Sequence, residues 1–135
     1  MSDAAPAEPP PSLADIDRLA QQALADLPRR FRRELGAVVV RVEEYPDPAT
    51  LDAMDLDDPD DLLGLYRGLP LPHKSVDRPL PQVDMIFLYR GPILMYCRAS
   101  GEAVDAVVRH VLIHEIGHHF GFSDADMARI ERARR

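Results

Sequence analysis

The sequence lacks the features that would direct it to a membrane or out of the cell. No apolar run approaches the ~18 residues that a transmembrane helix needs. The N-terminus becomes rich in alanine and proline soon after Met1, without the basic and apolar regions of a signal peptide. Cys97 is the only cysteine, so an internal disulfide is excluded. We therefore expect a cytoplasmic protein that does not associate with a membrane.

The sequence also lacks an excess of basic over acidic residues. The formal net charge is −7 at pH 7, which disfavours nucleic acid or an anionic membrane as the main partner. The basic cluster over residues 29–33 is interpreted as a solvated helix face. Acidic residues from Asp47 to Asp61 are irregularly spaced and lack the tight alternation of a calcium-binding EF-hand loop. This acidic segment is predicted to be a surface loop.

The first part of the chain predicts a tail and two helices. Residues 1–11 are rich in proline and are expected to form a disordered tail, followed by one domain over residues 12–135. Ser12 is a good N-cap for an amphipathic helix that runs to about Leu27. Pro28 can begin a second, short helix.

Three strands are expected in the middle of the chain. Residues 37–42 are β-branched and apolar, which is typical of a buried strand. Residues 62–67 contain a glycine in polar surroundings, which favours the edge of a sheet. A third strand is predicted over residues 83–89, then a short helix or turn over 93–98 and the longest helix over 102–120. This order indicates a small α+β domain.

The longest predicted helix carries His114-Glu115-Ile116-Gly117-His118, which matches the pattern H-E-x-x-H. Residues four apart in a helix lie roughly 6 Å apart along its axis, so both imidazoles can reach one zinc ion. Glu115 follows the first ligand and can take a proton from a zinc-activated water that attacks a carbonyl carbon. The pattern therefore predicts a zinc-dependent hydrolase with Glu115 as general base.

A third zinc ligand is expected because hydrolytic zinc sites use three protein ligands and a water molecule. Gly121 can end the helix with a positive φ and turn the chain back, so that Asp124 coordinates as a carboxylate. Asp124 could instead cap a last short helix that begins near Ser123 or Asp124, a role that Ser123 could fill equally well. Glu131, on that helix, is the rival third ligand.

Other polar residues are given lesser roles. His110 lies one turn before His114 and is interpreted as a supporting or surface residue, and His119 as a structural or exposed one. His73 lies in a proline-flanked loop, and Cys97 is interpreted as a small core residue. No oxyanion donor is assigned, and the candidates are Tyr66, Tyr89 and Arg67.

Together these motifs resemble the family of small bacterial zincin-like metallopeptidases, single domains little longer than the zincin core. The similarity runs from about Leu13 to Asp124, includes residues 62–71 and 86–92, and is most specific over 112–121. It implies a zincin-like fold with a small mixed or antiparallel sheet packed on the N-terminal helix and the motif helix. The site that it implies consists of the ligands His114, His118 and Asp124 and the base Glu115.

The main functional hypothesis is a zinc metallopeptidase whose substrate, a peptide or an unfolded protein segment, pairs with the edge strand at 62–67. Two alternatives stay open. One is a metal-dependent RNA hydrolase, because an RNA-maturation metalloprotein family spaces its ligands His-x3-His-x5-His and Asp124 falls at the third position. The presence of Glu115 and the acidic charge argue against it. The other is a non-catalytic, metal-stabilised interaction module. The oligomeric state is not predicted.

Overall fold

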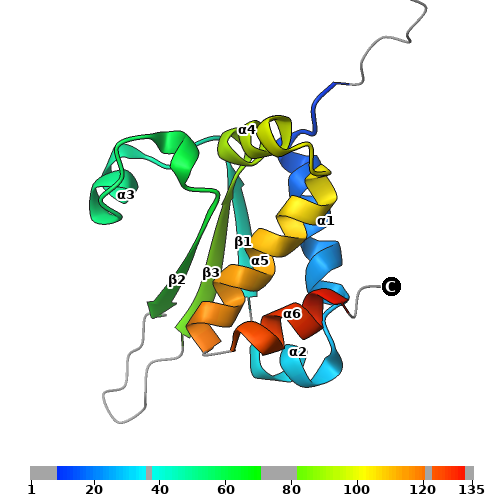
Figure 1. Cartoon of the computed structure of the whole chain (residues 1–135). Helices are drawn as coiled ribbons and strands as arrows, with labels where there is room; N and C mark the ends of the chain where they lie inside the picture. The colour runs from blue at the N-terminus through cyan, green and yellow to red at the C-terminus, as the bar shows by residue number, and fades with distance from the viewer. Residues whose placement is uncertain (1–8, 36–37, 71–81, 121–122, 133–135) are drawn as a thin grey trace, which may run out of the picture.

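The computed structural model describes residues 9–35, 38–70, 82–120 and 123–132, which form a small three-stranded sheet with helices packed on it (Figure 1). In chain order the elements are α1 (Leu13–Ala25), α2 (Arg29–Leu35), β1 (Val38–Glu43), α3 (Pro48–Ala53), the 3-10 helix η1 (Pro59–Asp61), β2 (Gly64–Pro70), β3 (Gln82–Tyr89), α4 (Arg90–Ser100), α5 (Val104–Phe120) and α6 (Asp124–Arg132). This mixed architecture confirms the predicted α+β class. No helix within the described ranges combines the length and the apolar character of a membrane span.

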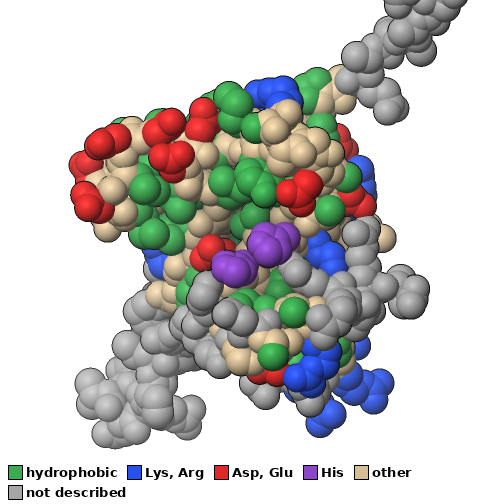
Figure 2. Space-filling model, viewed as in Figure 1, with side chains coloured by type: hydrophobic (Ala, Val, Ile, Leu, Met, Phe, Trp, Pro, Cys, Tyr) green, Lys and Arg blue, Asp and Glu red, His purple; other side chains and the backbone are tan. Residues whose placement is uncertain are grey.

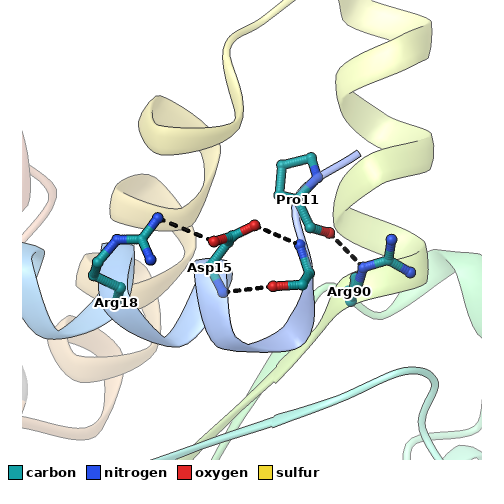
Figure 3. A network of polar contacts seen from close by, with 5 residues as sticks. Pro11, Asp15, Arg18 and Arg90 are labelled. Atoms are coloured by element: carbon teal, nitrogen blue, oxygen red, sulfur yellow. Dashed lines mark hydrogen bonds and ion pairs between the residues drawn. The ribbon is translucent and has the colours of Figure 1, made fainter. Parts of the chain in front are cut away.

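The N-terminal helix α1 begins at its predicted cap. The Ser12 hydroxyl accepts the N–H of Asp15 at 3.0 Å, and the Asp15 carboxylate accepts the N–H of Ser12 at 2.9 Å. This reciprocal capping box holds the pKa of Asp15 below its usual value, chiefly through the backbone bond to Ser12. The carbonyl of Pro11 accepts a hydrogen bond from Arg90 Nε at 2.6 Å (Figure 3). The start of α1 is thereby joined to the start of α4.

The sheet has the order β1-β3-β2, with β1 parallel and β2 antiparallel to the central strand β3. Ile86 in β3 pairs with Val40 on one side and Tyr66 on the other, and its side chain is fully buried. The predicted edge position of β2 is confirmed. The strand predicted in residues 37–42 is confirmed by β1, but its predicted burial is wrong, because β1 is the other edge of the sheet and its Val39 side chain is 45% exposed.

The acidic segment is more regular than the predicted surface loop, because two of its aspartates cap short helices. Asp47 accepts the N–H of Thr50 at 2.7 Å at the start of α3, and Asp58 accepts the N–H of Asp60 at 2.9 Å at the start of η1. A proline follows each capping aspartate, at a helix position whose N–H has no partner within the helix, so no hydrogen bond is lost. The bond to Thr50 lowers the pKa of Asp47. Acidic side chains gather on the surface of this segment (Figure 2).

The hydrophobic core lies between the sheet and the helices α1 and α5. From α5 it receives the buried side chains of Val107, Val108, Val111, Leu112, Ile113 and Ile116. A Cβ atom on Gly64 would lie only 2.5 Å from Val111 Cγ1, a distance that real Cβ atoms essentially never show. Glycine at the start of β2 therefore allows α5 to lie directly against this edge strand.

Candidate active site on the helix α5

The helix α5 divides the motif residues between the core and the surface. Ile113 and Ile116 are each only 2% exposed, whereas His114 and Glu115 between them are half-buried. His118 belongs to the same helix one turn further on, but its side chain lies outside the described residues. The apolar side of α5 therefore holds the helix in place and leaves His114 and Glu115 in contact with solvent.

Glu115 contacts the outer edge of β2. Its Oε1 atom accepts a hydrogen bond from the backbone N–H of Tyr66 at 3.2 Å. Just before β2 begins, the backbone N–H of Tyr89 donates to the carbonyl of Leu63 at 3.0 Å. The backbone groups of Leu63 therefore point toward β3. Because backbone groups alternate along an antiparallel strand, those of Gly64 and Tyr66 point away from β3. Among the described strands none pairs with this edge, and Glu115 occupies the Tyr66 N–H on it.

The hydroxyl of Tyr66 donates to a carboxylate oxygen of Asp84 on the neighbouring strand. Burial raises the pKa of Tyr66, and the hydrogen bond to Asp84 raises it further. Asp84 was not among the predicted site residues, although the alternation of β3 places it on the same face as the buried Ile86 and Leu88. Tyr66 therefore joins Glu115 to the central strand.

The other two oxyanion candidates belong to the opposite face of the sheet. Arg67 lies over the ring of Phe87, with its guanidinium carbon 5.5 Å from the ring centroid. Tyr89 stacks on the same ring at a centroid distance of 6.5 Å and is 2% exposed, and burial raises its pKa to about 12. Both side chains are turned away from Glu115, so Tyr66 is the candidate that lies beside the predicted base.

Two histidines lie side by side on the surface of α5. The rings of His110 and His114 stack at a centroid distance of 5.2 Å and an interplanar angle of 29° (Figure 2). His110 is exposed, as expected of a surface residue. Cys97 is half-buried against the core, and burial raises the pKa of its thiol, as expected of a small core residue. His73 and the side chain of His119 lie outside the described residues.

The last helix, α6, lies close against α5 at the motif glycine. A Cβ atom on Gly117 would overlap Met127 Sδ and would lie 2.7 Å from Met127 Cγ. Further along α6, the carbonyl of Ile130 accepts a hydrogen bond from the buried guanidinium of Arg109 at 2.8 Å. The small residue inside H-E-x-x-H therefore allows the segment after the motif to return beside it.

The cap of α6 is Ser123, which bears on the role of Asp124. The Ser123 hydroxyl accepts the N–H of Asp126 at 3.0 Å, and the Asp126 carboxylate accepts the N–H of Ser123 at 3.2 Å. Asp124 is the first residue of α6, so the structure does not use it as the cap. The side chains of Asp124 and Glu131 lie outside the described residues. Among the side chains that are described, no three His, Cys, Asp or Glu residues gather as a metal site requires.

Known proteins resemble this chain in sequence and in fold. A family model described as zincin-like metallopeptidase matches residues 35–134, so the chain belongs to this family, as its motifs predict. The structure is similar to that of a conserved hypothetical protein from Thermo thermophilus, with a TM-score of 0.50 and 24% sequence identity. The similarity covers 82% of this chain and 94% of that chain, and it shows a shared fold. No curated protein matches the sequence.

The contact between α5 and α6 makes a testable prediction. Gly117→Ala is expected to lower the free energy of unfolding by about 1–3 kcal/mol, because the added methyl group overlaps Met127. Urea denaturation followed by circular dichroism measures the change. Met127→Ala is the matched variant, and the double variant should lose less stability than the sum of the two single losses. Strictly additive losses would contradict the close approach of the two helices.

Proposed function

We propose that the chain is a zinc-dependent peptide hydrolase in which Glu115 acts as the general base. The observation that supports it most directly is the 3.2 Å hydrogen bond between the Glu115 carboxylate and the N–H of Tyr66. Tyr66 belongs to an outer sheet edge, and an extended peptide can bind such an edge as an additional strand. The predicted base and a peptide-binding edge therefore meet at the same point of the molecule.

The residues around this point suit zinc, which prefers imidazole nitrogen and carboxylate oxygen among its ligands. His114 and His118 are one helical turn apart in α5, and Asp124 begins the helix that returns to α5. These three residues would hold the metal and leave a fourth position for water or substrate. When bound, zinc supplies a Lewis acid that polarises a carbonyl oxygen and makes water more acidic.

The protein groups in this proposal have separate tasks. Glu115 accepts a proton from the attacking water and returns it to the leaving amine. The N–H of Tyr66 holds the Glu115 carboxylate toward the sheet edge on which the peptide lies. The Tyr66 hydroxyl already donates its single proton to Asp84, so no donor to the oxyanion on the cleaved carbonyl is assigned.

A peptide suits this environment better than RNA does. Glu115 lies on the outward side of α5, Glu102 lies just before that helix, and the chain carries a net charge of −7. These negative charges would repel phosphate groups. They do not repel a neutral or basic peptide, so we propose a peptide or an unfolded protein segment as the substrate.

The proposed ligands predict a pattern of zinc affinities. The wild-type chain is expected to bind about one zinc ion, and His114→Ala or His118→Ala should abolish binding because each removes one of three protein ligands. Asp124→Ala should weaken binding strongly as well. Competition with a chromophoric chelator measures the affinity of each variant.

Two control variants separate the role of Asp124 from that of its neighbours. Ser123→Ala should cost the α6 cap, about 1 kcal/mol of stability, and leave zinc affinity unchanged. Glu131→Ala should also bind zinc like the wild type. Unchanged affinity in Asp124→Ala together with loss in Glu131→Ala would assign the third ligand to Glu131. Wild-type affinity in both histidine variants would refute the zinc site itself.

The role of Glu115 predicts a loss of turnover without a loss of structure. Glu115→Gln keeps the shape of the side chain but cannot accept a proton, so kcat should fall by about 10²–10⁴ while zinc affinity persists. Digestion of a peptide library, analysed by mass spectrometry, measures the rate. Glu44→Gln is the matched control, since Glu44 binds Arg90 outside α5 and should keep wild-type turnover. Near wild-type rates in Glu115→Gln would show that Glu115 is not the base.

A further inference from the structure

A cavity of about 500 Å³ lies beside the candidate site, between α4, the first half of α5 and the residue that leads into β2. This volume is in the range of pockets that bind small molecules. In Figure 2 apolar side chains gather directly above the two histidine rings. The proposed hydrolysis does not account for this cavity.

The cavity adjoins the residues to which the proposed function assigns the reaction. His110 lines it and stacks on His114 at a centroid distance of 5.2 Å. Val111 forms another part of its wall and lies against Gly64, close to the backbone N–H of Tyr66 that binds Glu115. A peptide that lay along the edge of β2 beside Gly64 would therefore run next to the cavity.

The walls of the cavity combine apolar surface with one carboxylate. Leu63, Ala106 and Val107 offer aliphatic surface, and Glu102 contributes a carboxylate just before α5. The Tyr96 hydroxyl donates to Oε2 of Glu102 at 2.9 Å, which orients the carboxylate and leaves its other oxygen to a further donor. A long aliphatic side chain that ends in a cation matches both parts, because its methylene groups can pack on the walls while the cation reaches Glu102.

The charged residues in the cavity wall are of both signs. Arg109 also lines the cavity and carries a positive charge, but it is 5% exposed and donates to the carbonyl of Ile130 at 2.8 Å, so its guanidinium is directed toward α6. The acidic segment from Asp47 to Asp61 ends just before Leu63 and adds a negative potential on that side. Of the two charged residues, Glu102 is exposed and Arg109 is buried, so an incoming side chain meets the carboxylate first.

We propose that this cavity is a specificity pocket for a lysine or arginine side chain of the peptide substrate, next to the bond that is cleaved. Glu102 selects a positively charged side chain, and the aliphatic walls select a long one. The identification of the occupant as a substrate residue rests on the proposed function. The preference of the pocket for a long aliphatic cation does not depend on catalysis.

Binding of two small probes to the full chain tests the pocket without turnover. The probes are Nα-acetyl-lysine methylamide and the matching norleucine compound, which has the same stem without the charge. Titration followed by the NMR shifts of the Leu63, Val107 and Val111 methyl groups reports binding at the cavity. An exposed ion pair contributes up to about 1 kcal/mol, so the lysine probe should bind up to about five-fold more tightly at low salt.

Variants of Glu102 show whether its carboxylate is responsible. Glu102→Gln should make the two probes bind equally, and Glu102→Lys should make the glutamate analogue bind better than the lysine probe. Asp17→Asn, which removes one negative charge from α1, should keep the wild-type preference. Equal binding of lysine and norleucine by the wild type, a preference that survives Glu102→Gln, or no shift at the cavity methyl groups would each overturn the proposal.

Probe binding and peptide cleavage test the pocket and the proposed hydrolase separately. If the chain cleaves no peptide of the library but keeps a Glu102-dependent preference for the lysine probe, the proposed hydrolase is refuted and the pocket stands. If the library is cleaved without a basic residue beside the cut, the hydrolase stands and the specificity pocket is refuted.

Discussion

The helix α5 lies directly against β2 because Gly64 presents no side chain to Val111. This contact brings the carboxylate of Glu115 within 3.2 Å of the Tyr66 N–H on the outer edge of the strand. A larger residue at position 64 would separate the two elements and break that hydrogen bond. The position of the proposed base, the proposed peptide-binding edge and the neighbouring cavity all depend on how closely this helix and this strand approach each other.

Much of the fold follows from local sequence signals. The capping pair of Ser12 and Asp15 marks the start of α1, and the apolar residues of α5 recur with helical spacing. The glycine in residues 62–67 indicated an edge strand, and β2 is one. The H-E-x-x-H pattern predicts a motif helix, and His114 and Glu115 lie on its partly exposed side. Local chemistry determines each of these features, so the sequence alone is sufficient to predict them.

The features that sequence analysis missed depend on contacts between distant residues. β1 is an edge strand although four of its six residues are valine, because a sheet of three strands has only one central position, which β3 takes. The hydrogen bond from Tyr66 to Asp84 connects two strands, and the cavity beside Glu102 is lined by residues from separate elements. No local sequence pattern predicts contacts of this kind. The cap of α6 was left open between Ser123 and Asp124, and the tertiary structure assigns it to Ser123.

The central claim is that α5 and the start of α6 form one zinc site, and X-ray absorption at the zinc edge tests it most directly. The full chain, loaded with one equivalent of zinc, should show two imidazole nitrogens at about 2.0–2.1 Å and a carboxylate oxygen at about 2.0–2.2 Å. Multiple scattering from imidazole identifies the two histidines. A sulfur ligand at about 2.3 Å, for which Cys97 would be the only cysteine source, or a spectrum without imidazole scattering would contradict the account.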